Sequence, residues 1–514
     1  MIGFERRRDF DDFFNTSLIG VQGELDNKQV DRLKKIKRAW NFYEGYHWEE
    51  MPELDTPELT INYCRAFVNK FVAFELGKSF TMSTHKSMEN VKITDDGRTS
   101  FEYLEDVWED NNQYRLTNDL GQMKSVTGEA WLQVRYFSAD EIEDPYGEYA
   151  NGRVRVLLIP TNVVFPEFDP HDREKLTRVT IMYTYEKIVR TGILGKLTKK
   201  QALYKQIWTK DECVVIDDGQ EPQHYPNKYK VIPFVLIKNL TVAGRTEGIS
   251  DLDDIIPLNV ELNMKESNVS EIIDYHAAPI TIVYGAKVGN LEKGANKMWG
   301  GLAKDARVEN LELKGDLGAS QQHINNLKLQ MCEVGGVPET VLGGAQAISN
   351  TSGVALQYIN LPLIERTRVK RINTEDGLEQ INKLILLVSL LEGLITKPEN
   401  IPNRDFFHTE CSLPDTLPKD MLLELQQIQQ EMKMGIESRK NAAKRAGKEN
   451  VDTLFEDIDK DLEKNPCFYG HSDPNDPRHF PNNDQQLNSG FTNGQTPVEQ
   501  VRKELTGRNG GAEE

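Results

Sequence analysis

The sequence has few cysteines, no long hydrophobic run and no leader-like start. Its five cysteines include no CxxC pair, so we interpret them as reduced thiols in a cytosolic protein. The longest apolar run, 384–395, is too short to cross a bilayer and contains Glu392 and Gly393. Residues 1–15 mix arginines with aspartates and lack the apolar stretch of a signal peptide. We therefore expect a soluble protein that is neither exported by that route nor inserted in a membrane.

An excess of basic residues is also missing. The 62 lysines and arginines are outnumbered by 81 aspartates and glutamates, which gives a formal net charge of -19 at pH 7. Such a chain is not expected to clamp nucleic acid through one continuous basic face. At 514 residues the chain is too long for a single hydrophobic core, so roughly two to four folding units are expected.

Two short motifs resemble catalytic loops but are incomplete. The tripeptide GKS at 77–79 resembles the end of a phosphate-binding loop, but position 72 is valine where that loop needs its first glycine. The tripeptide GIS at 248–250 begins like a nucleophile elbow, but the second glycine is replaced by Leu252. Ser250 is better explained as a helix N-cap.

Metal ligands are not evident either. Asp251, Asp253 and Asp254 have two explanations, Mg²⁺ ligands of a nuclease or carboxylates that oppose the dipole at a helix N-terminus, and we favour the second. Two histidine and cysteine pairs, at 408–411 and 467–471, have ligand-like spacing but no second pair that would complete a zinc site. The sequence therefore predicts no catalytic residue, no metal and no cofactor.

The first 250 residues combine amphipathic helices with short strands. Apolar residues recur at three- and four-residue spacing over 27–46, 61–76 and 101–125, which predicts helices. Runs of β-branched and aromatic residues, separated by Gly, Pro, Asp and Asn, then predict mostly antiparallel strands. These runs are 131–136, 153–159, 162–165, 179–185, 204–208 and 231–237. The predicted fold class is α+β.

From residue 251 the pattern is helical, with a small insert. An apolar stripe predicts a helix over 251–276, in which Pro257 is tolerable only in the first turn. Two predicted strands, 280–284 and 307–313, flank a glycine-rich stretch. A second helix is predicted over 320–334, with Val334 on its apolar face.

A small, polar segment at 343–353 then predicts a mobile loop. A helical run follows over 354–360, and Pro362 separates it from a long helix that reaches about residue 391. The expected buried stripe of that helix includes Ile364 and Ile372. Further expected elements are a strand at 406–411, polar-faced helices over 418–463 and a disordered tail beyond 465.

The order of these segments, with a few local motifs, points to one family. The motifs are YEGYHW at 43–48, INYCRAFVNK at 61–70, LGK at 76–78, DLDDIIPLN at 251–259, VPE at 337–339 and TSGVAL at 351–356. With an α+β first half, a helix, a small β insert, a second helix, a flexible loop and another helix, the chain resembles the portal proteins of tailed double-stranded DNA bacteriophages. The resemblance covers residues 30–465.

The resemblance implies a homo-oligomeric ring, a dodecamer, at one capsid vertex of the virion, assembled in the bacterial cytoplasm. Double-stranded DNA would pass through it without sequence-specific contacts. The implied partners are the terminase large subunit, head-completion or adaptor proteins, and the major capsid and scaffolding proteins. The implied parts are a wing (1–250), stem helices (251–276 and 319–336), a clip (277–318), a tunnel loop and tunnel helix (337–362), a long helix with a returning wing strand (363–417), a helical crown (418–465) and a disordered tail (466–514).

Three sets of residues are functional candidates under this resemblance. Small flexible residues suit a loop that approaches moving DNA without reading bases. These tunnel-loop candidates are Gly343, Gly344, Ser349, Asn350, Thr351, Ser352 and Gly353. Within 287–314 six basic residues outnumber four acidic ones, which favours a docking surface for terminase and connector proteins. Its candidates are Lys293, Lys297, Met298, Trp299, Lys304 and Arg307. Four more basic residues either face DNA near the tunnel or pair with acids of a neighbouring subunit: Arg366, Arg368, Lys370 and Arg371.

The acidic composition is compatible with a conduit. Each phosphate that a protein neutralises adds affinity, and a channel that bound DNA tightly would hold it in place. Two other classes stay open. A capsid or scaffold protein would also be acidic and self-associating. A DNA-processing enzyme of the packaging machinery, a nuclease or a terminase-like ATPase, is less favoured because the sequence lacks a Walker A loop and spaced acidic metal ligands.

Overall fold

The computed structural model describes residues 25–49, 59–142, 144, 147, 149–191, 196–277, 281–284, 307–310, 317–343, 358–414, 421–446 and six positions between 451 and 460. Its contacts divide the chain into two compact units, Met1–Pro418 and Lys419–Glu514. Every element below belongs to the first unit unless the second is named.

Before residue 128 the described chain forms four α-helices. They are α2 (Asn27–Glu44), α3 (Tyr63–Leu76), α4 (Ser100–Asp110) and α5 (Gln113–Thr127). α2 starts with a reciprocal capping box between Asp26 and Gln29 and ends at Gly45, whose φ of 99° suits a left-handed C-cap. The helical structure predicted for 101–125 is confirmed, but it is divided into two helices. Asn112, at φ 54°, separates α4 from α5 and caps α5 by accepting from Arg115 N.

Two antiparallel sheets follow. The three-stranded sheet has the order β3-β2-β9, with β2 (Glu129–Phe137), β3 (Arg153–Ile159) and β9 (Phe234–Lys238). The five-stranded sheet runs in chain order through β4 (Val164–Phe168), β5 (Leu176–Thr191), β6 (Lys196–Trp208), β7 (Glu212–Asp217) and β8 (Gln223–Pro226). β1 (Thr81–Thr84) pairs with the distant β12 (Thr409–Ser412). Short 3-10 helices lie at η2 (Lys86–Met88), η3 (Ala139–Glu141) and η4 (Thr161–Val163). The predicted α+β class is confirmed.

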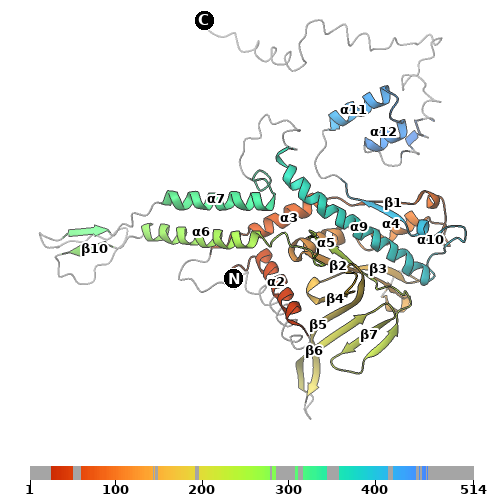
Figure 1. The fold of residues 1–514 in the computed structure, drawn as a ribbon, viewed down its shortest axis with the longest axis horizontal. Helices are drawn as coiled ribbons and strands as arrows, with labels where there is room; N and C mark the ends of the chain where they lie inside the picture. The colour runs from red at the N-terminus through yellow and green to blue at the C-terminus, as the bar shows by residue number, and fades with distance from the viewer. Residues whose placement is uncertain are drawn as a thin grey trace, which may run out of the picture. The chain divides into compact units, whose positions relative to one another are not determined.

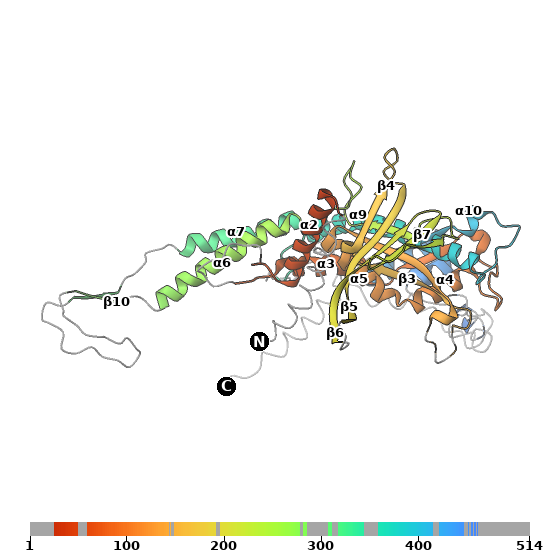
Figure 2. The same cartoon turned by 90° about the horizontal axis from the view of Figure 1, so that it is seen from below.

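A helical hairpin extends away from the sheets (Figures 1 and 2). α6 (Ile255–Ala277) and α7 (Leu317–Gly335) pack against each other, and between them β10 (Thr281–Tyr284) pairs antiparallel with β11 (Arg307–Asn310). Pro257 lies in the first turn of α6, as its missing N–H requires. The predicted helix, β insert and second helix are therefore present, although Val334 is 47% exposed rather than part of the apolar face.

One long helix, α9 (Leu361–Leu391), completes the body and packs on β2, β9 and β12. Its second half buries Leu378, Ile381 and Ile385 in the core shared with the three-stranded sheet, as predicted. The stripe predicted for its first half is wrong, because Ile372 is 51% exposed. The buried positions there are Leu363, Thr367, Lys370 and Thr374. A short helix, α10 (Asn403–Phe406), precedes β12.

In the second unit the described residues form α11 (Met421–Lys433) and α12 (Arg439–Arg445). The Arg445 guanidinium binds the carboxylates of Glu431 and Glu437 and so links the two helices. Both helices lie within the polar-faced helical region that the sequence predicts for 418–463.

A glycine sets how closely α9 approaches β9. A Cβ added at Gly377 would lie 2.5 Å from Ile237 Cγ1. Alanine ordinarily stabilises a helix relative to glycine, by about 1 kcal/mol. Here Gly377→Ala should instead lower the free energy of unfolding, by about 1–3 kcal/mol, because the core is overpacked. Urea unfolding measures the change. Adding Ile237→Val, which removes one of the clashing carbons, should recover part of the loss, and an unreduced loss would contradict the close contact.

Candidate functional site

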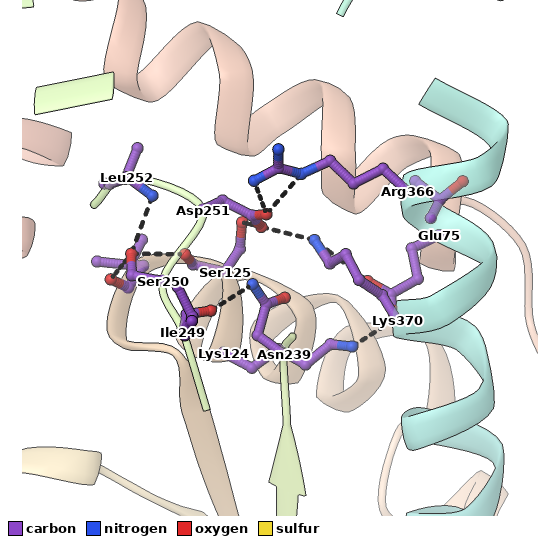
Figure 3. A network of polar contacts seen from close by, with 12 residues as sticks. Glu75, Lys124, Ser125, Asn239, Ile249, Ser250, Asp251, Leu252, Arg366 and Lys370 are labelled. Atoms are coloured by element: carbon purple, nitrogen blue, oxygen red, sulfur yellow. Dashed lines mark hydrogen bonds and ion pairs between the residues drawn. The ribbon is translucent and has the colours of Figure 1, made fainter. Parts of the chain in front are cut away.

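A carboxylate is buried where the chain enters the helical hairpin. Asp251 lies in the turn that precedes α6, and its residue is 1% exposed. Its Oδ2 accepts from Ser125 Oγ at 2.6 Å and from Lys370 Nζ at 2.7 Å. Its Oδ1 accepts from Nε and Nη2 of Arg366 at 3.2 and 3.1 Å (Figure 3). One carboxylate therefore joins the start of the hairpin to α5 and α9.

A second buried carboxylate extends this cluster. Glu75, near the end of α3, pairs with Lys124 of α5, and its Oε2 lies 3.5 Å from Lys370 Nζ. Lys124 Nζ also donates to Thr374 Oγ1 at 2.6 Å, and Thr374 Oγ1 lies 2.8 Å from Glu75 Oε1. We call the whole set the charge junction. Its members are Glu75, Lys124, Ser125, Asp251, Arg366, Lys370 and Thr374.

Burial and pairing act in opposite directions on the acids of the charge junction. Burial raises the pKa of Glu75, but the ammonium groups of Lys124 and Lys370 outweigh it and hold the pKa below its ordinary value. Burial likewise raises the pKa of Asp251, and the cations of Lys370 and Arg366 outweigh it. Both acids are therefore ionised at neutral pH. Burial lowers the pKa of Lys124, and Glu75 opposes that shift.

Arg366 also reaches the other end of the hairpin. Its Nη1 donates to the carbonyl of Val334, in the last turn of α7, at 3.3 Å. Its Cζ and Lys370 Nζ lie 5.0 and 4.9 Å from the ring centroid of Phe71, which adds cation–π attraction. The start of α6 and the end of α7 are thus both held by α9, the helix that follows the predicted tunnel segment.

A second polar contact holds segment 59–63 along α6. Three polar side chains of α6 make this contact, and their spacing of four residues places them on one face of the helix. The contacts, of 2.8–3.1 Å, join Asn259 to the backbone of Ile61 and Tyr63, Asn263 to the backbone of Ile61, and Ser267 to the backbone of Leu59. We call Asn259, Asn263 and Ser267 the amide ladder.

His47 fixes the orientation of one amide in this ladder. Its Nε2 lies 2.9 Å from the Phe42 carbonyl, so Nε2 carries the proton and donates. Its Nδ1 then accepts from Asn263 Nδ2 at 2.6 Å. Burial lowers the pKa of His47, and the hydrogen bond to the Phe42 carbonyl only partly opposes this. The ring is therefore neutral at neutral pH, the state that this contact requires.

The structure corrects the interpretation of one basic residue on α9. Lys370 was expected to face DNA or a neighbouring subunit, but its side chain is 0% exposed and binds acids of its own chain. Arg366 is largely committed to Asp251, and Arg371 Nη2 donates to the carbonyls of Phe74 and Pro414, both at 3.0 Å. Arg368 is exposed, and its proposed contact with DNA or with a neighbour stays a prediction.

Most of the other predicted site residues lie outside the described residues. These are Gly344, Ser349, Asn350, Thr351, Ser352, Gly353, Lys293, Lys297, Met298, Trp299 and Lys304. Gly343 is described, at φ 100°, a conformation that favours glycine. Arg307 begins β11 and pairs with Glu309 on the same strand.

Sequence reasoning missed Glu75 and Lys124 entirely, and for Asp251 it weighed a Mg²⁺ ligand against a helix-dipole carboxylate and favoured the second, without foreseeing a buried ion pair. The spacing of Arg366, Lys370 and Thr374, four residues apart, was the available signal, because it marks one face of a helix. It does not reveal whether that face is outside or buried, since its partners lie more than a hundred residues away in the sequence.

The described residues give no support for catalysis. Among them no group of three or more His, Cys, Asp or Glu side chains could hold a metal ion, and no described helix is long and apolar enough to cross a membrane. Burial raises the pKa of Cys64 and Cys411 to about 12, which keeps both thiols protonated. What the described residues do show is a set of buried charges that hold helices in place.

The chain belongs to the phage portal protein family described as SPP1 Gp6-like, whose model matches residues 22–465. The predicted family is thereby confirmed, and it is a structural family rather than an enzyme family. No curated protein matches the chain. Similar solved structures include a chain in the virion of a native gene transfer agent particle, at 11% identity and a TM-score of 0.39, covering 82% of this chain and 94% of that one. Another similar chain is in the neck of an empty gene transfer agent particle, computed with C6 symmetry. It is 12% identical with a TM-score of 0.42, and the match covers 84% of this chain and 98% of that one.

Removing the charge of Asp251 should destabilise the protein. Asp251→Asn leaves Lys370 without its main partner, and breaking a buried pair in this way costs about 3–5 kcal/mol at pH 7. Because the folded chain lowers the pKa of Asp251, the stabilisation is present above about pH 4 and is lost as the pH falls through the lowered value. The difference between Asp251→Asn and the unchanged chain in urea unfolding should therefore shrink in acid.

Asp254→Asn is the matched control, because Asp254 is an exposed aspartate three residues away. It should change the free energy of unfolding by less than about 0.5 kcal/mol. The double variant Asp251→Asn/Lys370→Met removes both charges and should recover part of the stability lost in Asp251→Asn. Simple addition of the two single losses would show that the charges act independently.

Proposed function

We propose that this chain forms a closed homo-oligomeric ring, a dodecamer, at one capsid vertex of a phage virion. The ring is the channel through which double-stranded DNA is packaged, retained and ejected. Family membership over residues 22–465 carries this proposal. The hairpin of α6 and α7 supports it, because a helical pair that extends away from its own sheets needs neighbours, and copies of one chain in a closed ring supply them.

The described elements support the division into portal parts. The two sheets and helices α2–α5 belong to the proposed wing, α6 and α7 are the proposed stem helices, and the β10–β11 pair belongs to the proposed clip. α9 and β12 are the long helix and the returning wing strand, and α11 and α12 belong to the proposed crown. Residues 337–362 remain the proposed tunnel loop and tunnel helix.

Exposed apolar side chains on α9 support contacts between subunits. Val369 and Ile372 are 42% and 51% exposed, and Leu361 is 44% exposed at the start of the same helix. Apolar side chains gathered on one surface of a single chain mark a contact with another molecule. In a ring, the adjacent subunit would cover them.

The clip is the proposed docking surface for the terminase large subunit and later for head-completion or adaptor proteins. A two-stranded pair such as β10–β11 is marginally stable by itself, so it gains from packing against other copies or partners. The basic excess of 287–314 would attract acidic surfaces of those partners. The major capsid and scaffolding proteins would contact the ring at its vertex.

The competing functions make different predictions for the purified protein. A capsid or scaffold protein would form shells or filaments, and a nuclease or ATPase would turn over DNA or ATP. Imaging of the negatively stained protein should show closed rings with a central channel. Shells, filaments or monomers would contradict the portal proposal, and so would measurable turnover of DNA or ATP.

Deleting Gly344–Asn350 should leave ring assembly intact and impair DNA packaging or retention. The segment is small and polar, so it adds little to a core, and the proposal places it against DNA. Imaging checks assembly, and nuclease-protected DNA in assembled particles checks packaging. A deletion variant that fails to fold would show that the segment belongs to the core instead.

A further inference from the structure

Two strands of the five-stranded sheet extend beyond their neighbours (Figure 1). β4 pairs with β5 only as far as Ile181, and β7 pairs with β6 only as far as Tyr204. Beyond these points, residues 184–191 of β5 pair with residues 196–203 of β6, and no other described strand pairs with either. We call these two stretches the ribbon. Because a two-stranded pair is marginally stable by itself, the ribbon gains stability from a partner that covers it.

One face of the ribbon is already covered by the chain that follows β6. Side chains alternate between the two faces along each strand, so Lys187 and the opposite Lys200 lie on the same face. Both ammonium groups reach the carboxylate of Asp218, at 3.7 and 3.5 Å. The hydroxyl of Tyr185, on the same face, donates to Asp217 at the end of β7. This face is therefore held by the end of β7 and the turn after it.

The opposite face, which we call the open face, is exposed and basic. Ile188 is 66% exposed, and the exposed Lys199 lies beside it with its Nζ 2.7 Å from Glu186 Oε2. Two basic positions and one acid leave an excess of positive charge around apolar positions. The open face consists of three cross-strand pairs, Glu186 with Gln201, Ile188 with Lys199, and Arg190 with Leu197.

The inner end of the open face lies under the start of α2. Leu25, just before the N-cap of α2, packs against a small cluster that includes Leu33 and Met182, with Leu203 beside it. By alternation Met182 belongs to the same face as Ile188, and Leu203 lies opposite Thr184 on that face. The residues that precede Leu25 therefore start directly at the open face.

The chemistry of residues 9–14 complements that face. Their sequence, DFDDFF, holds three aspartates and three phenylalanines, and no lysine or arginine occurs between residues 9 and 24. Carboxylates suit the basic positions of the open face, and phenyl rings supply the apolar area that would cover Ile188. The ten residues between Phe14 and Leu25 can span up to about 33 Å, whereas Ile188 is only about 13 Å along the strand from Thr184.

We propose that residues 9–14 bind the open face of the ribbon in the same chain, with their phenyl rings on Ile188 and their carboxylates at the basic positions. The tether at Leu25 gives the segment a high effective concentration at its own ribbon, so it binds there in preference to the ribbon of another copy. A covered ribbon is also protected from pairing with strands of other molecules. This inference goes beyond the proposed function and does not depend on it.

Hydrogen exchange of the full chain and of a chain that lacks residues 1–14 tests the contact. The deletion leaves all the described elements, which begin with α2 at Asn27, in the chain. Amides of the ribbon should exchange severalfold faster in the shortened chain, because the ribbon opens more often without its cover. Exchange in the sheet of β2, β3 and β9 should not change. Ribbon exchange that is unaffected by the deletion would overturn the proposal.

Point variants test the same contact from the side of the ribbon. Ile188→Ser removes the apolar centre of the open face, and Tyr225→Ser is the matched control, because Tyr225 is 51% exposed on β8 of the same sheet. Chymotrypsin cleavage after Phe13 and Phe14, followed by mass spectrometry, reports how often the segment is released. Cleavage should be severalfold faster with Ile188→Ser and unchanged with Tyr225→Ser. An equal effect of the two variants, or none from Ile188→Ser, would contradict the proposal.

A mixed preparation separates binding within one chain from binding between copies. The shortened chain is coexpressed with the Ile188→Ser chain, so that each chain lacks one side of the contact. The two ribbons differ in mass at position 188 and are followed separately. Fast exchange in the ribbon of the shortened chain supports binding within one chain, and restored protection would assign the segment to a neighbouring copy and overturn the proposal. None of these measurements requires rings or DNA, so the inference and the proposed function can fail independently.

Discussion

Asp251 is buried where the entry to the hairpin meets α5 and α9, and it is held there by groups that these two helices supply. A bare carboxylate in such a place would be strongly unfavourable, so the turn before α6 can be buried only while Lys370, Arg366 and Ser125 remain in contact with it. Lys370 in turn depends on Glu75, and Glu75 on Lys124. The positions of α3, α5, α9 and the entry to the hairpin are therefore mutually dependent.

Periodicity and turn residues were sufficient for the locally determined parts of the fold. The strand at 153–159, the first helix and the two helices of the hairpin follow from side chains that alternate or recur within each element. The break at Asn112 was missed because a left-handed residue leaves no mark on apolar spacing. The buried stripe predicted for the first half of α9 was wrong for another reason. Its buried face carries Lys370 and Thr374, whose partners are set by tertiary structure rather than by neighbours in the sequence.

The candidate site was predictable to a smaller extent. The family resemblance depended on segment order, which survives when individual residues change, and the family match agrees with it. The role of a residue, by contrast, depends on whether its side of the helix faces the core or the solvent. Arg366, Arg368, Lys370 and Arg371 lie within six positions of one another, yet one is fully buried, one is exposed and two bind groups of their own chain. The residue types alone do not predict these different outcomes, because all four side chains are strongly polar and would be expected at the surface.

The amide ladder binds segment 59–63 through its peptide groups alone. Each hydrogen bond that joins Asn259, Asn263 or Ser267 to residues 59–63 ends on a backbone nitrogen or oxygen of that segment. The demand for specific residues is therefore one-sided. The three positions on α6 must keep hydrogen-bonding side chains of suitable length, whereas the segment can exchange side chains wherever its extended path is preserved. Substitutions in related chains should accordingly accumulate on the segment much faster than on the helix face that holds it.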